Sequence, residues 1–174
     1  MRAFIAIDLP EEIKKHLSEI QSKLLVKEAE LNPTNSFHLT LKFLGDIDDS
    51  ENITKNLSNI KSKKFKLNLT SLGFFPNKNY IRVIWVGTNQ NKKLTDIAEK
   101  IDTSLPHFKR DHKFHPHITL ARVKNVFDKQ EFKKVLSNIK IQNLEFDVKD
   151  FILYKSTLTR QGPIYEKVQT FDLS

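Results

Sequence analysis

Apolar and polar residues alternate along some stretches of this chain and recur every three to four residues along others, which predicts a mixture of strands and helices. In residues 37–43 the alternation is strict: Phe37, Leu39, Leu41 and Phe43 are apolar, and between them lie His38, Thr40 and Lys42. This pattern predicts a half-buried strand with His, Thr and Lys on its polar face. The pattern returns in His117-Ile118-Thr119-Leu120.

The other patterns predict an alternation of strands and helices. Continuous or alternating apolar runs predict strands at 3–8, 65–70, 80–87, 144–148, 151–154 and 164–171. Apolar residues at helical spacing predict four helices, at 13–24, 53–60, 94–105 and 132–139. Asp128, with Glu131 three residues later, predicts an N-terminal cap for the last helix. Polar, glycine or proline residues predict breaks at 32–35, 73–76 and 162–163.

The second half of the chain repeats the first at a nearly constant offset. His38 and His117 are 79 residues apart, and at the same offset the segment Leu57–Lys61 is identical to Leu136–Lys140. At the same offset, the apolar residues 4–7 of the first predicted strand align with the apolar residues 83–86. An internal repeat predicts that equivalent strands occupy equivalent places in the fold.

Length, cysteine content and charge limit the class of protein. The 174 residues suit a single domain, which we divide into two repeats at about 1–77 and 78–174. The absence of cysteine excludes disulfides, thiolate metal sites and cysteine nucleophiles. No apolar stretch approaches a membrane span, and the run at 1–9 is too short for a signal peptide, so we expect a cytoplasmic protein with no membrane partner. The net charge of +8 favours an anionic partner such as RNA, although lysine is abundant throughout the chain.

The two His-x-Thr motifs are the candidate site. A histidine and a threonine two positions apart in a strand project from the same face. If the repeats pack around a twofold axis, His38 and Thr40 lie opposite His117 and Thr119. Two facing imidazoles can act as an acid–base pair near neutral pH, and two hydroxyls can hold the non-bridging oxygens of a phosphate. The motifs therefore predict phosphodiester chemistry, with the histidines as catalytic residues and the threonines as substrate ligands.

Two more residues are candidates for substrate binding. Arg122 follows the second motif and can contact a phosphate with two nitrogens. On a regular strand it points away from His117, so a bulge or strand end at Ala121 is required. Lys42 lies on the motif face of a regular strand and is a further candidate. No third ligand of a suitable type lies near His115 and His117, so neither a metal nor another cofactor is expected.

Four segments carry a resemblance to a known family. They are Phe4–Pro10, His38–Gly45, Pro116–Arg122, and the ending with Ser156-Thr157-Leu158, Gly162-Pro163 and Tyr165. Together they resemble the two-histidine phosphoesterase superfamily, and within it the bacterial and archaeal RNA 2',3'-cyclic phosphodiesterases, also named 2'-5' RNA ligases. The resemblance covers nearly the whole chain.

The resemblance implies a fold and a reaction. The fold would be α+β, bilobal and internally duplicated, with one sheet per lobe, helices packed outside, and a central cleft that carries the two His-x-Thr strands. The reaction would be a metal-independent opening of a terminal 2',3'-cyclic phosphate on RNA, leaving a 2'-phosphate. His38 would protonate the departing 3'-oxygen and His117 would activate water, while Thr40, Thr119 and Arg122 bind the phosphate. Run backwards, the site could join a cyclic phosphate to a 5'-hydroxyl in a 2'-5' linkage.

Two other functions remain open from the sequence. In the first, the protein is a non-catalytic module that binds RNA ends, and the His-Thr pairs only hold phosphate. In the second, the same fold acts on a small cyclic nucleotide or a 2',5'-linked oligoadenylate. Whichever function holds, the loops at 76–79 and 107–116 would set the size of the substrate, and the basic character of the second loop suggests RNA or an oligonucleotide. We expect a monomer in each case.

Overall fold

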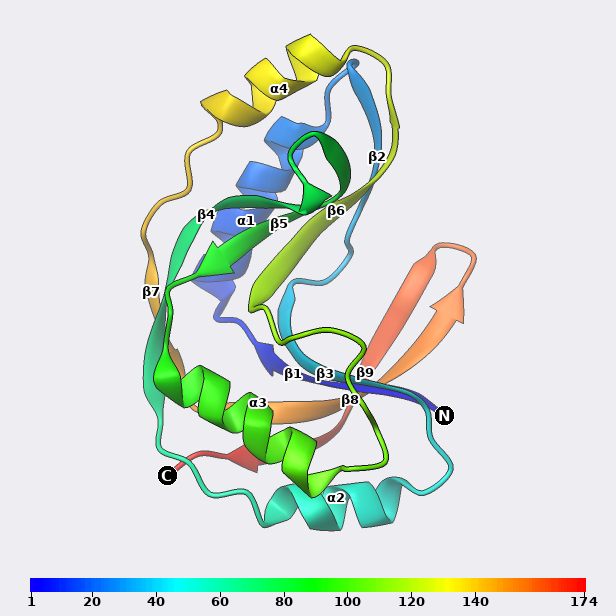
Figure 1. Cartoon of the computed structure of the whole chain (residues 1–174), viewed down its shortest axis with the longest axis vertical. Coiled ribbons are helices and arrows are strands. Elements are labelled where there is room, and N and C mark those ends of the chain that lie inside the picture. Colours follow the sequence, from blue (N-terminus) through cyan, green and yellow to red (C-terminus); the bar gives the residue numbers. More distant parts are fainter.

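Nine strands and four helices make up the computed structural model, which describes residues 1–174 (Figure 1). The strands are β1 (Arg2–Asp8), β2 (Ala29–Pro33), β3 (His38–Asp46), β4 (Phe65–Asn77), β5 (Tyr80–Thr88), β6 (His117–Val126), β7 (Glu145–Val148), β8 (Asp150–Thr159) and β9 (Gly162–Asp172). The helices are α1 (Glu11–Leu24), α2 (Ser50–Ser58), α3 (Lys92–Ser104) and α4 (Lys129–Asn138). None of them combines the length and the apolar character that crossing a bilayer requires. The predicted α+β class is confirmed.

The strands form one curled antiparallel sheet in the order β7-β4-β5-β6-β3-β1-β8-β9, with β2 paired to β6. The two halves of this sheet meet at β3 and β6, which share a single residue pair, Leu39 with Ile118. These two residues are 79 positions apart and are therefore equivalent in the repeat. The pair thus lies on an approximate twofold axis. We predicted one sheet per lobe, and this junction joins the two into one.

Each lobe combines elements from both halves of the chain. One lobe contains β3, β1, β8 and β9 with α2 and α3, and the other contains the remaining strands with α1 and α4 (Figure 1). Helix α1 follows β1 but packs on the other lobe, where Gln21 Nε2 donates hydrogen bonds to the backbone oxygens of Leu120 (2.8 Å) and Thr34 (3.0 Å). Helix α3 follows β5 but contacts β3. Because these helices cross over, the lobes do not coincide with the repeats.

One apolar core of 36 buried residues runs through both lobes. Each helix contributes an apolar stripe; in α1 the stripe consists of Ile13, Leu17, Ile20 and Leu24, none of them more than 1% exposed. Burying a Leu or Ile side chain stabilises a fold by about 1.5–3 kcal/mol. The helix-covered face of the sheet therefore holds the fold together, and the opposite face is available for polar residues.

The structure corrects two of the predicted breaks. Residues 73–76 lie inside β4, because Gly73 lets the Trp85 indole of β5 pack directly against the backbone, where a Cβ atom would come within 2.2 Å of the ring. Residues 32–35 were predicted to be a break, but the stretch up to Pro33 is β2, a short edge strand on β6. The predicted cap of α4 is confirmed, since Asp128 Oδ1 accepts a hydrogen bond from the Glu131 backbone N–H (3.1 Å).

Candidate active site

The junction of β3 and β6 brings the two His-x-Thr motifs to the middle of the sheet. Leu39 and Ile118 are fully buried on the helix-covered face. Because side chains alternate along a strand, the histidine and threonine on either side of each point to the opposite face. His38, Thr40, His117 and Thr119 are all partly exposed there, and the imidazoles are close enough for the charge on His117 to lower the pKa of His38. The structure thus brings the four predicted residues together.

Both motif strands contain a β-bulge at the same point of the repeat. In β3 the partners along β1 pass from Thr40 to Lys42, and in β6 the partners along β5 pass from Thr119 to Ala121. Leu41 and Leu120 are the extra residues, and they are equivalent at the offset of 79. A bulge shifts the alternation of side chains by one residue. The residues directly after the bulge therefore face the opposite way from the regular pattern.

The bulge in β6 turns Arg122 toward the site. Arg122 is exposed, and its positive charge adds to burial in lowering the pKa of His117. The same charge opposes the burial that raises the pKa of Tyr165. The residue therefore lies on the motif face, where a regular strand would not have placed it. Phe43, its equivalent in β3, lies on the same face, is 70% exposed, and has its ring centroid 6.2 Å from that of Phe4.

Aromatic rings surround each imidazole. The centroid of the His38 ring lies 5.0 Å from that of Phe4, 5.3 Å from that of Tyr165 and 6.5 Å from that of Tyr154. The centroid of the His117 ring lies 4.9 Å from that of Phe75 and 5.9 Å from that of Trp85. Burial lowers the pKa of His38 to about 4 and also lowers the pKa of His117. Both imidazoles are therefore neutral at pH 7 in the free protein.

A backbone hydrogen bond orients the His117 ring. His117 Nδ1 lies 2.7 Å from the carbonyl oxygen of His115. A neutral imidazole must donate from that nitrogen, which leaves Nε2 with a free lone pair. The backbone of Ser36 lies two residues upstream of His38, is equivalent to His115 in the repeat, and acts to raise the pKa of His38 against the larger effect of burial.

The comparisons with known proteins agree with this duplicated site. The model of the family described as LigT-like phosphoesterase matches the chain twice, at residues 7–85 and 86–165. The chain belongs to the LigT-like phosphoesterase family.

Relatives and solved structures match this LigT-like phosphoesterase over nearly its full length. The RNA 2',3'-cyclic phosphodiesterase of Methanocaldococcus jannaschii is 39% identical over 97% of this chain and 99% of its own. The RNA 2',3'-cyclic phosphodiesterase of Thermotoga maritima is 38% identical over 95% of this chain and 92% of its own. A structure from Thermus thermophilus has a TM-score of 0.80 at 28% identity, covering 99% of this chain and 97% of that one. The Escherichia coli LigT complexed with 3'-AMP has a TM-score of 0.79 at 28% identity, covering 99% and 98%.

The charges around the two histidines of this phosphoesterase differ. Asp8 pairs with His38 across β1 and β3, and its negative charge raises the pKa of His38 against the larger effect of burial. The position equivalent to Asp8 is Gly87, which pairs with His117. His117 instead has the Arg122 cation nearby. The duplicated site is therefore asymmetric, with an anion beside one imidazole and a cation beside the other.

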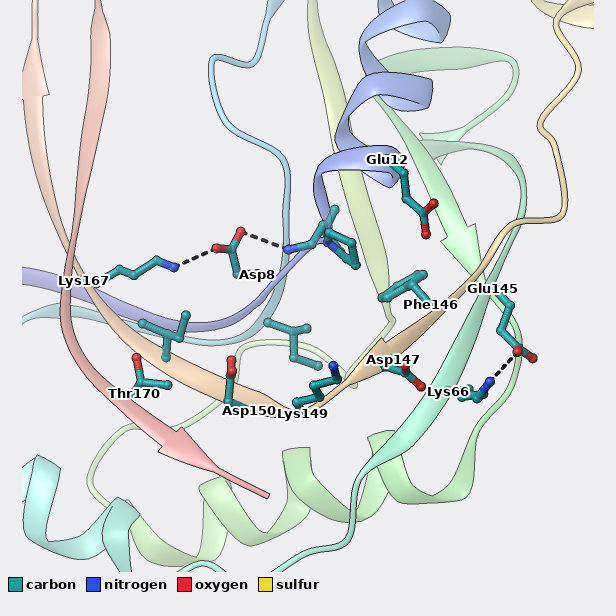
Figure 2. A pocket seen from close by; sticks show the side chains of 14 residues that line it. Asp8, Glu12, Lys66, Glu145, Phe146, Asp147, Lys149, Asp150, Lys167 and Thr170 are labelled. Atoms are coloured by element: carbon teal, nitrogen blue, oxygen red, sulfur yellow. Dashed lines mark hydrogen bonds and ion pairs between the residues drawn. The ribbon is translucent and has the colours of Figure 1, made fainter. Parts of the chain in front are cut away.

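Sequence reasoning missed Asp8, whose carboxylate the structure holds in place. Asp8 lies 2.8 Å from the ammonium group of Lys14. It also lies 2.8 Å from the ammonium group of Lys167 and accepts a hydrogen bond from the Leu9 backbone N–H (2.9 Å) (Figure 2). Burial acts to raise the pKa of Asp8, but the hydrogen bonds with the two lysines outweigh it, so the pKa lies below its usual value. Asp8 is therefore negatively charged at neutral pH. The only signal in the sequence was its mismatch with Gly87 in the repeat.

A pocket of about 440 Å³ opens beside Asp8 (Figure 2). Its charged lining includes Glu12, Asp147, Lys149 and Lys167 but none of the six residues that the sequence singled out. The six predicted residues therefore lie outside this pocket, which borders the site at Asp8. No group of three or more His, Cys, Asp or Glu side chains is placed to hold a metal ion.

The prediction that Lys42 shares the motif face is wrong, because the β3 bulge points its side chain toward the protein interior. Lys42 is 2% exposed, and its Nζ lies 2.5 Å from Asp102 Oδ1 of α3. The other carboxylate oxygen lies 2.5 Å from Arg110 Nε, and Arg110 Nη2 donates a hydrogen bond to the carbonyl oxygen of Leu41 (2.6 Å). This ion cluster ties the bulge of β3 to the loop that leads to His117.

Replacing Asp102 by alanine is expected to lower the free energy of unfolding by about 3 kcal/mol, since it leaves the buried Lys42 charge unpaired. The measurement is urea denaturation of the variant beside Glu99→Ala, an exposed acid of the same helix. Adding Lys42→Met to Asp102→Ala should restore most of the loss, because the more deeply buried of the two cations that Asp102 pairs with is then gone. Equal losses for Asp102→Ala and Glu99→Ala would show that the cluster is not structural.

Proposed function

We propose that this chain hydrolyses the 2',3'-cyclic phosphate at an RNA terminus to a 2'-phosphate by metal-independent, two-histidine acid–base catalysis. The observation that carries the proposal is the grouping of both His-Thr pairs and Arg122 on one face around the twofold axis. The names of the relatives support the substrate, and a LigT structure at 28% identity holds 3'-AMP, a nucleotide with a 3'-phosphate.

In the proposed reaction, water attacks phosphorus opposite the 3'-oxygen. His117 Nε2 takes a proton from the water, the bond between phosphorus and the 3'-oxygen breaks, and His38 delivers a proton to that oxygen. Thr40, Thr119 and Arg122 donate hydrogen bonds to the non-bridging oxygens, whose charge grows in the transition state. A cyclic phosphate keeps its leaving oxygen attached to the substrate, so acid, base and hydrogen-bond donors suffice. The reverse reaction with a 5'-hydroxyl would give a 2'-5' linkage.

The asymmetry of charge supports this assignment of roles. An acid must carry a proton, and the Asp8 carboxylate favours the protonated form of His38. A base must be neutral, and the Arg122 cation disfavours the protonated form of His117. An anionic substrate raises the pKa of both imidazoles and thus helps His38 to hold its proton. Exchange of the two roles would place each histidine beside the wrong charge.

We further propose that residues 1–174 act as one two-lobed domain, with repeats at about 1–77 and 78–174, and as a monomer in the cytoplasm. The shared core and the two crossing helices support a single domain. Each lobe is built from elements of both repeats, so neither repeat can form a complete lobe alone. The absence of cysteine fits a reducing compartment. No membrane partner is part of the proposal.

The experiment that tests the function is incubation with a 2',3'-cyclic-phosphate RNA in excess EDTA, followed by identification of the product isomer. A 2'-phosphate product is the expected result. A 3'-phosphate product, or loss of activity on chelation, would overturn the mechanism. Parallel reactions with a small cyclic nucleotide and a 2',5'-linked oligoadenylate compare the alternative substrates, and faster turnover of either would replace RNA as the substrate.

The pH dependence of kcat/KM should peak below pH 6.5. The reaction needs one proton on the histidine pair, and the pKa of His38 is lowered to about 4 while that of His117 is lowered from 6.5. The singly protonated pair is therefore most populated on the acid side, and activity falls as pH rises through the pair's upper pKa. Initial rates at low substrate and constant ionic strength measure this profile. A maximum above pH 7 would contradict it.

A further inference from the structure

A second groove, of about 360 Å³, lies at the opposite end of β6 from His117. The turn between β4 and β5, the last residues of β6 and helix α4 form its walls. Its apolar lining includes Ile81, Val123 and Phe132. Five cationic side chains line it, and no acidic one does; the five are Lys78, Arg82, Lys124, Lys129 and Lys133.

This concentration of positive charge is local and largely uncompensated. Lys124 has the one acidic partner in the set, Glu30 at 3.4 Å, while Lys133 contacts only the neutral Asn79 (3.3 Å). Lys78 and Lys129 are exposed and take part in no ion pair. By contrast, five acidic and three basic residues line the pocket beside Asp8. The groove therefore does not simply reflect the lysine content of the chain.

Exposed aromatic rings accompany the cations. Tyr80 is 61% exposed, and the guanidinium of Arg82 lies 5.8 Å from its ring centroid and donates a hydrogen bond to its hydroxyl (3.0 Å). Phe127, directly after β6, is 68% exposed. Aromatic rings that alternate with cations suit single-stranded nucleic acid, because the bases stack on the rings while the cations contact the phosphates.

Strand β6 connects the groove to the site. Arg122 and Lys124 are both exposed on β6, and Lys124, which has no backbone partner on β2, also lines the groove. The distance from His117 to Lys124 along the strand is roughly 20 Å at about 3.3 Å per residue. A few nucleotides can span this distance, and the cations along the way match the charge of their phosphates.

We propose that this groove binds the sugar–phosphate backbone of single-stranded RNA on the 5' side of the reacting end. The inference rests on the proposed function, since it places the body of the RNA whose cyclic phosphate occupies the His-Thr site. The groove then makes the protein prefer an RNA chain to a dinucleotide. It contributes affinity without reading sequence, because phosphate contacts are the same for every base.

The test compares substrates of two lengths. The triple variant Lys78→Gln, Lys129→Gln and Lys133→Gln should raise KM by about tenfold or more for a cyclic-phosphate RNA of about 12 nucleotides. Its KM for a cyclic-phosphate dinucleotide should stay within about twofold of wild type, because that substrate does not reach the groove. For an unreactive 3'-hydroxyl RNA of the same length, a plot of log affinity against log salt concentration has a negative slope. The variant should make this slope less negative by about 2, because three phosphate contacts are lost.

The matched control removes the same charge at the other end of the molecule. Lys55, Lys63 and Lys64 are exposed in and after α2, whereas α4 lies at the opposite end (Figure 1). Their replacement by glutamine should leave both KM values nearly unchanged. An equal rise of KM in the two triple variants would overturn the proposal that the groove binds RNA. So would a wild-type KM that is the same for the 12-nucleotide RNA and the dinucleotide. If wild type binds the 3'-hydroxyl RNA through the groove but turns nothing over, the proposed function fails and the groove stands.

Discussion

Replacing His117 by alanine is expected to lower kcat on a cyclic-phosphate RNA by about 10³-fold, and His38→Ala should have an effect of the same size. Without His117 nothing accepts the proton of the attacking water, and without His38 the 3'-oxygen must leave as an alkoxide. The double variant should be little worse than either single one, because the two groups act as a unit. Single-turnover rates at saturating protein measure the chemical step directly.

The same variants separate an enzyme from a binding module. RNA that ends in the 2'-phosphate product should bind the alanine variants within a few-fold of wild type, since the threonines and Arg122 remain. His112→Ala, in the exposed part of the loop before β6, is the control and should keep full activity. A loss of less than tenfold for either motif histidine would refute two-histidine catalysis. A wild-type protein that binds cyclic ends without turnover would be the non-catalytic module.

The grouping of the two motifs could be predicted from the sequence because two independent patterns agreed. The alternation placed each histidine and threonine on one face, and the constant offset made the two strands equivalent. Equivalent strands that meet do so across a twofold axis, and the Leu39–Ile118 pair lies on that axis. Neither pattern required knowledge of a long-range contact.

The prediction for Lys42 was wrong because the bulge was expected in only one of the two equivalent strands. The orientation of Arg122 demanded a bulge in the second strand, and the structure has one at Leu120. Applied to the first strand at the same offset, that bulge turns Lys42 inward and Phe43 outward, as the structure shows. No glycine or proline marks either bulge, so the side-chain alternation alone could not reveal it.

Other features depended on contacts that a single sequence does not contain. Helices α1 and α3 each pack on the lobe opposite the strand that precedes them. Their apolar stripes have the same spacing, so the sequence does not show on which half of the sheet each helix packs. The role of Asp8 depends on its register opposite His38 in β1 and β3. Sequence patterns predict elements and faces well, but they do not predict register between distant strands.

Replacing Arg122 by alanine should lower kcat/KM by about 10²-fold to 10³-fold, the usual loss for one donor to a developing oxyanion. Arg122→Lys should recover only part of this, because an ammonium cannot make the paired contact of a guanidinium. Lys55→Ala, an exposed cation of α2, serves as the control and should change little. An Arg122→Ala variant with kcat/KM within a few-fold of wild type would remove Arg122 from the phosphate site.

The pH profile of Arg122→Ala tests the asymmetry of the site. The Arg122 cation lowers the pKa of His117, so its removal should raise that pKa and move the alkaline limb of kcat/KM to higher pH. Adding Phe43→Arg returns the cation at the equivalent position of the other repeat, on the side of His38. Because a cation there opposes protonation of the proposed acid, hydrolysis should stay low. Recovery to wild-type rates would mean that the phosphate needs only a nearby cation, and that charge asymmetry does not assign the two roles.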